Sequence, residues 1–345
     1  MSLRTLTAAC HCKSINFTIT ILAELFPLKV HICHCSVCRR THGTPCIFHA
    51  PLPDGVAPQF IVPSNMSMLT SYNHAESMGT RHFCSTCGCH VGDLGHDDGN
   101  WVISTAIFTE PNHNLWEMRS HTFTKSSSDG GLSAILSHID GRQLDVFNPD
   151  LLTDNNNSEH GQKDAEAESK KLLAKCHCGG VSFSISRPRP DFIASPRSKG
   201  WILPQDPNKW LAVLDICDDC RLVDGSNVIA WMFVPTDHIS PHPGDLIIGS
   251  SKSYKSSEGV LRTFCGTCGA TVFYSCADRP GIVDVAVGIL RAEGVMVEDW
   301  ALWRTGRMTS AADGLKYDPA FGKALIEGFK LWGEQRGMPE DFILP

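Results

Sequence analysis

The chain has 345 residues, of which 42% are hydrophobic and 19% are charged, as expected for a globular protein with room for two domains. Its formal charge of −7 argues against binding to nucleic acid phosphates or anionic membranes. Because no apolar signal core and no membrane-length stretch is present, we expect a cytoplasmic protein. Thiols stay reduced there, so the 16 cysteines should be metal ligands or reactive thiols rather than disulfides.

Short apolar runs, several of them alternating with polar residues, predict a protein built mainly from β-strands. In chain order they are SINFTI at 14–19, WVISTAIF at 101–108, VSFSIS at 181–186 and VIAWMFV at 228–234. The last predicted element is an amphipathic helix at 319–337, PAFGKALIEGFKLWGEQRG, which begins with proline and repeats apolar residues at helical spacing. We expect it to pack on the second half of the chain.

The cysteines repeat, and the repeat divides the chain into two similar halves. Each half opens with Cys-His-Cys, continues with a denser cysteine cluster and ends with Cys-x-x-Cys-Gly. The sequence therefore predicts a tandem duplication, with a first domain at 1–149, a polar linker at 150–172 and a second domain at 173–345. Two copies of one domain are expected to form an internal pseudo-dimer, and a homo-oligomer is also compatible with this arrangement.

The second half also contains an insertion at 187–210, rich in proline and tryptophan. We expect an ordered surface loop that covers a pocket where the halves meet. In the alternative interpretation, Trp201 and Trp210 are anchors of the hydrophobic core.

The outer cysteine pairs of each half have the spacing of a structural zinc site. A Cys-x-Cys and a distant Cys-x-x-Cys together supply the four thiolates that close a tetrahedron around Zn²⁺. Glycines follow both Cys-x-x-Cys pairs, at Gly88 and Gly269, where a tight turn is expected. The predicted ligands are Cys10, Cys12, Cys84 and Cys87 in the first half and Cys176, Cys178, Cys265 and Cys268 in the second.

The denser cluster of the first half, CHCSVCRR at 33–40, leaves the three thiols Cys33, Cys35 and Cys38. Three protein ligands leave one position of zinc open, which is typical of catalytic sites. Alternatively, a fourth ligand closes a structural site, and the candidates are His31, His34, His42, Cys46 and Cys89.

Neighbouring polar residues have two interpretations as well. Arg39 and Arg40 would balance the charge of the thiolates and hold a carboxylate, or they form a solvated surface pair. His34 or His42 would move a proton, or His34 only orients the loop.

The matching stretch of the second half, LDICDDCRLVDG at 214–225, keeps Cys217 and Cys220 but has Asp215 where the first half has Cys33. A carboxylate also ligates zinc, so Asp215, Cys217 and Cys220 remain a candidate metal site, although a harder one. Asp218 and Asp219 add negative charge. We expect a degenerate site rather than an altered chemistry, and both interpretations stay open.

The pattern CHC…CHCSVCRR…FCSTCG resembles the glutathione-dependent formaldehyde-activating enzyme family, which includes the centromere protein V-like proteins. The resemblance implies an Mss4-like β fold in each half, a structural zinc on the outer cysteines, and a second zinc at Cys33, Cys35 and Cys38 where a thiol substrate reacts. It also implies carbon–sulfur lyase chemistry, which joins glutathione and formaldehyde to S-hydroxymethylglutathione or reverses that step.

We therefore expect a zinc-dependent carbon–sulfur lyase that acts on a glutathione adduct of formaldehyde or of a related small electrophile. The expected catalytic groups are Cys33, Cys35 and Cys38 with His34 and Arg39. One alternative is a zinc-dependent lyase or isomerase with another small substrate. The other is a non-catalytic zinc scaffold that binds protein.

Overall fold

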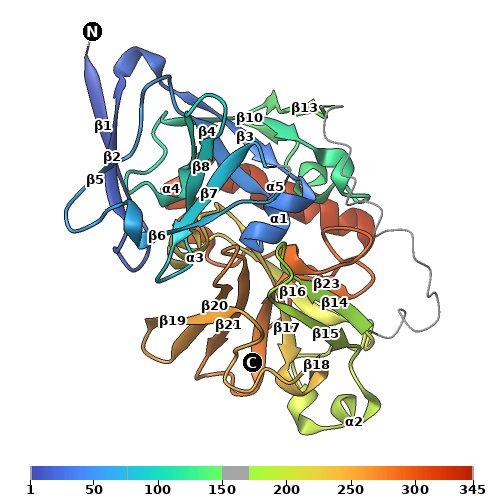
Figure 1. Ribbon diagram of the computed structural model, residues 1–345. Helices are drawn as coiled ribbons and strands as arrows, with labels where there is room; N and C mark the ends of the chain where they lie inside the picture. The colour runs from blue at the N-terminus through green and yellow to red at the C-terminus, as the bar shows by residue number, and fades with distance from the viewer. Residues whose placement is uncertain (1, 76, 150–170, 344–345) are drawn as a thin grey trace.

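The computed structural model describes residues 2–75, 77–149 and 171–343. Two β-rich halves pack against each other, the first blue to green and the second green-yellow to red (Figure 1). The mainly β fold with a C-terminal helix is thus confirmed. Most of the predicted linker lies outside the described residues, but its last two residues, 171–172, already belong to strand β14 (Lys171–Lys175). No helix in the described part is long and apolar enough to cross a membrane.

The first half contains an eight-stranded sheet and a three-stranded sheet within the described residues. The large sheet runs in the order β13 (Asp145–Phe147), β10 (Trp116–Thr122), β3 (Leu28–Cys33), β4 (Ile47–Pro51), β9 (Trp101–Ser104), β8 (His90–Gly95), β7 (Gly79–Cys84) and β6 (Leu69–Tyr72). The small sheet has the order β1 (Leu3–Ala9), β2 (Asn16–Leu22) and β5 (Gln59–Phe60). A two-stranded ladder joins β11 (His138–Ile139) to β12 (Arg142–Gln143).

The second half repeats this topology except for β13 and the β11–β12 ladder, which have no counterpart among its described strands. Its seven-stranded sheet runs in the order β19 (Ser251–Ser257), β20 (Val260–Cys265), β21 (Thr271–Cys276), β22 (Ile282–Ala286), β17 (Ile229–Pro235), β16 (Trp210–Asp215) and β23 (Ala301–Trp303). Its three-stranded sheet consists of β14, β15 (Ser182–Ser186) and β18 (Ile239–Ser240). Strand β16 is therefore the counterpart of β3, and β20 the counterpart of β7, so the duplication read from the cysteines extends to the whole fold.

The predicted strands follow from side-chain patterning. In β2 and β15 buried residues alternate with more exposed ones, as expected for a sheet that covers the core with one face, whereas every residue of β17 is buried. The prediction at 101–108 was wrong in its second part. Strand β9 ends at Ser104, and a 3₁₀ helix, η3 (Thr105–Ile107), follows because the chain turns there to contact the other half.

Two short helices carry the dense cysteine clusters, α1 (Ser36–His42) and α3 (Asp218–Asp224). Both begin in the same way, because the N-cap cysteine sulfur accepts the backbone N–H of the cysteine three residues later. The remaining helical segments are η1 (Ala23–Leu25), η2 (Met66–Met68), η4 (Thr124–Ser126), η5 (Gly131–Ala134), α2 (Pro190–Ile193), η8 (Pro196–Ser198), η9 (Thr236–His238), η10 (Val287–Ile289), α4 (Ala311–Tyr317) and α5 (Pro319–Arg336).

Helix α5 confirms the predicted C-terminal helix, and Asp318 caps it by accepting the N–H of Phe321. The helix packs on the second half, as expected, and it also packs on the first half. Phe329 of α5 contacts Trp303 of the second half, but Phe321 contacts Phe48 of the first half at a ring distance of 5.3 Å. The helix therefore contacts both halves, and its red ribbon runs behind the blue strands of the first half in Figure 1.

The halves are also joined by a pair of pseudo-symmetric contacts made by the Cys-His-Cys turns. Nδ1 of His11 lies 2.7 Å from the hydroxyl of Tyr254, and Nδ1 of His177 lies 2.7 Å from the hydroxyl of Tyr72. The backbone N–H of each histidine also donates to a carbonyl of the opposite helix, α3 or α1, at 3.0 Å. The internal pseudo-dimer is therefore present in the fold.

The insertion at 187–210 does not cover a pocket between the halves. It forms α2 and η8 and packs on its own half, where Trp210 is fully buried and Trp201 is 7% exposed. The ring of Trp201 contacts Phe233 on β17. Both tryptophans are core anchors, which was the alternative interpretation.

Candidate metal centres and active site

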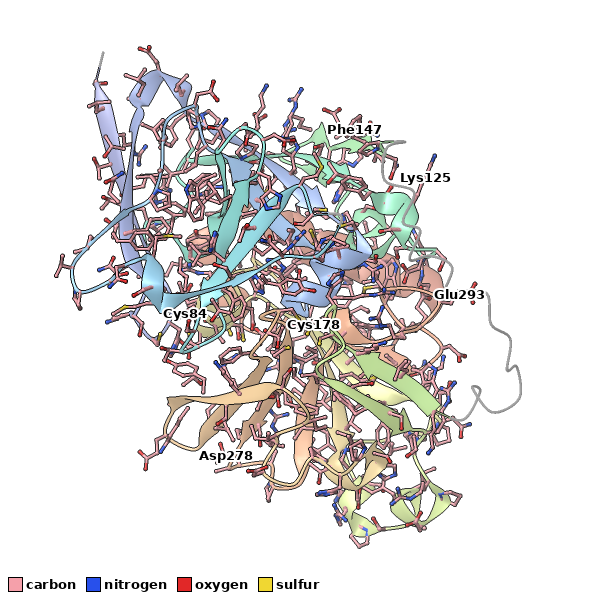
Figure 2. All side chains as sticks on the ribbon, in the orientation of Figure 1. Cys84, Lys125, Phe147, Cys178, Asp278 and Glu293 are labelled. Atoms are coloured by element: carbon pink, nitrogen blue, oxygen red, sulfur yellow. The ribbon has the colours of Figure 1, made fainter. Side chains whose placement is uncertain are left out.

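The outer cysteines of each half converge from two hairpins that are distant in the sequence. Cys10 and Cys12 lie in the turn after β1, and Cys84 and Cys87 lie at the turn after β7. The four sulfurs lie within 4.8 Å of one another, and the second half repeats this arrangement. Figure 2 labels one member of each cluster, Cys84 and Cys178, near the boundary between the halves.

The geometry of these clusters fits zinc. A tetrahedron with zinc–sulfur bonds of about 2.3 Å separates its sulfurs by about 3.8 Å. The Sγ atoms of Cys10 and Cys12 are 3.4 Å apart, and those of Cys176 and Cys178 are 3.5 Å apart. Backbone N–H groups also point at the sulfurs, as those of Ile15 and Val181 do at 3.4 and 3.3 Å. Such N–H groups stabilise thiolates, so the donor set and its surroundings both suit a closed structural site.

The inner cluster of the first half brings together three thiols. Cys33 ends β3, Cys35 caps α1 and Cys38 lies in the first turn of that helix, with their sulfurs within 4.8 Å of one another. Cys33 and Cys35 are half-buried, whereas Cys38 is buried. Hydrogen bonds with Cys33 and Cys38 lower the pKa of the Cys35 thiol well below its usual value. This donor set also fits zinc, with one tetrahedral position not filled by the cluster.

The inner cluster of the second half places Asp215 in the same arrangement. One carboxylate oxygen of Asp215 accepts the N–H of Cys217 at 3.0 Å, and the other lies 3.5 Å from the sulfur of Cys220. The three ligand atoms of Asp215, Cys217 and Cys220 lie within 4.8 Å of one another. A mixed oxygen and sulfur set also binds zinc, so the substitution leaves a usable ligand set in place.

Each inner cluster contacts one buried arginine. Arg81 on β7 directs Nη2 toward the sulfur of Cys38 at 3.8 Å, and Arg262 on β20 directs both terminal nitrogens toward Cys220 at 3.6 and 3.7 Å. Burial alone would lower the pKa of Arg81, but the charges of Cys38 and Asp93 raise it above its usual value. Both guanidinium groups are thus placed to stabilise negative charge on sulfur.

Buried polar groups lie behind the first inner cluster. His49 on β4 has Nδ1 3.9 Å from the carboxylate of Asp93, and its Nε2 is buried with no hydrogen-bond partner among the described residues. Burial lowers the pKa of His49, while the charges of Asp93 and Cys38 act in the opposite direction. His31 pairs with His49 in the β3–β4 register, and its Nδ1 lies 2.9 Å from the Ser120 hydroxyl.

A cavity of about 460 Å³ opens on the second inner cluster. Asp215, Cys217 and Cys220 form part of its wall, together with aromatic side chains such as Trp231 and Tyr274. All of its lining residues come from the second half. A smaller cavity of about 320 Å³ lies between α5 and the segment around 135–141 of the first half.

The comparison with protein families matches the same two segments that carry these clusters. The model of the glutathione-dependent formaldehyde-activating enzyme family, GFA, matches residues 5–126 and 204–305, more than half of the chain. This chain belongs to the GFA family. The two separate matches agree with a tandem duplication. A search of curated proteins found no match.

In this GFA protein, no candidate fourth ligand joins the first inner cluster. Among the described residues, the set of mutually close ligand atoms ends with the three cysteines. The ring of His42 stacks on His90 at 3.6 Å, and Cys46 and Cys89 are fully buried in the core. The open three-thiol interpretation is therefore the better supported of the two.

The other predicted site residues of this GFA protein contact the loop around the cluster. Nε2 of His34 lies 2.8 Å from Nδ1 of His121, whose other nitrogen contacts the carbonyl of Leu136 at 2.6 Å. Arg39 donates to the backbone oxygens of His34 and Ser126 at 2.9 and 3.0 Å. These contacts favour an orienting role for His34 and Arg39, and their catalytic roles stay predictions.

Sequence reasoning missed Arg81, Arg262, His49 and Asp93. The arginines had a visible signal, because each stands three residues before the first cysteine of its Cys-x-x-Cys pair, in RHFC and RTFC. The pair of His49 and Asp93 had none, since these residues lie on strands β4 and β8, which flank β9 only in the folded sheet.

Proposed function

We propose that this GFA protein is a zinc-dependent carbon–sulfur lyase, with its reaction centre at Cys33, Cys35 and Cys38. The substrate would be a glutathione adduct of formaldehyde or of a related small electrophile. The observation that carries this proposal is the set of three mutually close thiols, to which no other described residue adds a ligand atom. Membership of the GFA family supports the glutathione-related chemistry.

Zinc held by the three cysteines would lower the pKa of a thiol that fills its fourth position, so that the thiolate forms near neutral pH. The chain supplies two further functions. Arg81 stabilises the negative charge of the cluster, since its guanidinium already faces Cys38. In the proposed tautomer His49 carries its proton on Nδ1, which lies 3.9 Å from the carboxylate of Asp93, and Nε2 accepts the substrate proton.

The proton transfer accounts for both directions of the reaction. In cleavage, Nε2 of His49 takes the hydroxyl proton of S-hydroxymethylglutathione, the carbonyl of formaldehyde forms, and the carbon–sulfur bond breaks with its electron pair left on sulfur. In synthesis, the thiolate attacks formaldehyde and His49 returns the proton to the new alkoxide. His34 and Arg39 act indirectly, because they fix the loop that carries Cys33 and Cys35.

The location of the reaction is tested with matched cysteine variants. Zinc content and S-hydroxymethylglutathione cleavage are measured for Cys33→Ser and for Cys217→Ser, which removes one thiol of the second inner cluster. We expect each variant to lose one zinc per chain, and only Cys33→Ser to lose cleavage of the glutathione adduct. A fully zinc-loaded wild-type protein that turns over no glutathione adduct would refute the lyase and leave the scaffold alternative.

The role of His49 is tested without disturbing the metal. His49→Gln should lower the cleavage rate about 10²- to 10⁴-fold, the usual contribution of a general base, at unchanged zinc content. His113→Gln, which changes an exposed histidine of the same half, serves as the control. Equal rates for the two variants would exclude His49 as the proton acceptor.

A further inference from the structure

The second inner cluster differs from the first in its surroundings more than in its ligands. Asp215 is only 8% exposed, and the N–H of Cys217 fixes one of its oxygens so that the other faces the sulfur of Cys220. If the substitution of Cys33 by Asp215 had only destroyed the site, the carboxylate would have no reason to be fixed toward the sulfur of Cys220. The cluster also opens on a cavity of about 460 Å³, large enough for a small-molecule ligand.

Two sets of substitutions distinguish this cavity from the first site. Asp215 bridges to Thr309 as Cys33 pairs with Thr122, so Ser310 is the counterpart of Phe123. Both residues have a left-handed backbone, with φ of 54° and 58°. The small serine therefore lines the cavity where the first half has a phenylalanine ring. In the aligned strands, Trp231 on β17 stands where His49 stands on β4.

The cavity has an excess of acidic groups. Besides Asp215, its wall includes Asp218 and Asp219 on α3 and Asp313 on α4. Asp218 is paired with Arg221 at 2.7 Å, whereas Asp313 has no ion pair among the described residues and only accepts the N–H of Asp218. A carboxylate is thus available to a ligand.

Both arginines of the wall are already engaged. Arg279 donates to both carboxylate oxygens of Asp284 at 2.9 and 3.0 Å, and Arg262 directs its terminal nitrogens to Cys220. Neither guanidinium is available to neutralise a carboxylate of a ligand. Glutathione has two carboxylates and one ammonium group, so its net negative charge would meet repulsion there, while an aminothiol without a carboxylate would be attracted.

We propose that the second cavity binds a small aminothiol, with its thiol at the metal held by Asp215, Cys217 and Cys220 and its ammonium group near Asp313. This inference rests on the proposed function in one respect: both assume that a thiol occupies the open position of a bound zinc. It differs from the proposed function in site and in ligand class, because the charge of the wall selects against the glutathione that the first site would accept.

The test uses cobalt in place of zinc, because the absorption of cobalt changes when a new thiolate coordinates it. The full chain is prepared as the Cys33→Ser variant, in which the first inner cluster lacks one ligand. The second inner cluster then keeps all three of its ligands, Asp215, Cys217 and Cys220. Three thiol probes of similar size are titrated: cysteamine, 2-mercaptoethanol and thioglycolate, which carry positive, no and negative charge beside the thiol. We expect cysteamine to bind at least tenfold more tightly than thioglycolate, with 2-mercaptoethanol between them.

Two variants in the same background locate the selectivity. Asp313→Asn keeps an oxygen that accepts the N–H of Asp218, and it should reduce the preference for cysteamine to within a few-fold. Glu24→Gln, which removes an exposed carboxylate from the first half, should leave the preference unchanged. Ser310→Phe should fill the cavity and abolish the response to all three thiols at unchanged cobalt content.

Some results would overturn the inference. They are equal or tighter binding of thioglycolate, an unchanged preference in Asp313→Asn, or a cobalt spectrum to which Cys217→Ser makes no difference. Failure of the lyase assay at the first cluster would leave these binding measurements intact, so the two proposals fail independently.

Discussion

Replacing Gly43 with alanine tests whether the two halves are docked as a rigid pair. Gly43 ends α1 with a left-handed φ of +81°, and a Cβ there would lie 2.4 Å from the carbonyl oxygen of Thr271 in the other half. The left-handed conformation costs a non-glycine residue about 1–2 kcal/mol. Forcing extra volume into a packed interior costs about 1–3 kcal/mol more. We therefore expect Gly43→Ala to lower the free energy of unfolding by about 2–5 kcal/mol.

Two other glycines separate these contributions. Gly55 has a similar φ of +77° but open space around its Cβ position, so Gly55→Ala should cost only the conformational part, about 1–2 kcal/mol. Gly288 has no left-handed φ, yet its Cβ would lie 2.3 Å from the nitrogen of Thr44 in the other half. Gly288→Ala should therefore cost only the packing part, about 1–3 kcal/mol.

The assay is urea unfolding followed by tryptophan fluorescence, with zinc content measured on the same samples. Zinc content matters because α1, which Gly43 terminates, begins at the predicted ligand Cys35. Equal destabilisation by Gly43→Ala and Gly55→Ala would refute the reasoning, since it would mean that the opposite half exerts no steric constraint at Gly43.

Three further predictions concern the interface, the outer cluster and a buried carboxyl. Tyr72→Phe and Tyr254→Phe each remove one hydroxyl contact to a histidine of the other half, and each should cost about 1 kcal/mol in urea unfolding, with additive effects in the double variant. Cys84→Ser should release one zinc per chain to a chelating dye and lower the unfolding midpoint more than Cys33→Ser does, because the outer cluster joins two hairpins; an equal midpoint for both would contradict a structural role. Burial raises the pKa of Asp224 to about 6, so the folded state favours its protonated form and loses stability as the pH rises from about 4 to about 6. Asp224→Asn should remove that loss, measured as the difference in unfolding free energy between pH 4 and pH 7, and identical pH profiles would contradict it.

Much of the fold was predictable because its signals are local. Alternation of apolar residues identified β2 and β15, a continuous apolar run identified β17, and helical spacing after a proline identified α5. The prediction failed for the end of β9, where buried residues form a 3₁₀ helix instead. A run of buried residues is compatible with a β-strand and with a 3₁₀ helix. Which of the two forms after Ser104 depended on contacts with the neighbouring half.

The four candidate metal-ligand sets were predictable for a related reason. Cysteine spacing is itself the constraint, since two ligands on one turn must be close in sequence. Spacing alone, however, did not decide between an open and a closed site at Cys33, Cys35 and Cys38. That choice depended on where the candidate fourth ligands lie, and among the described residues none of them joins the three sulfurs within 4.8 Å.

The sequence by itself determined the duplication, the four candidate ligand sets and the replacement of Cys33 by Asp215, because residue type and spacing are sufficient to identify each of them. Only the tertiary structure decided the surroundings of the two inner clusters. His49 and Asp93 approach each other because β4 and β8 both flank β9, and Ser310 lines the second cavity at the position that Phe123 occupies in the first half. The reactivity of a metal site depends on such neighbours from distant segments, and their proximity arises only when the sheets assemble.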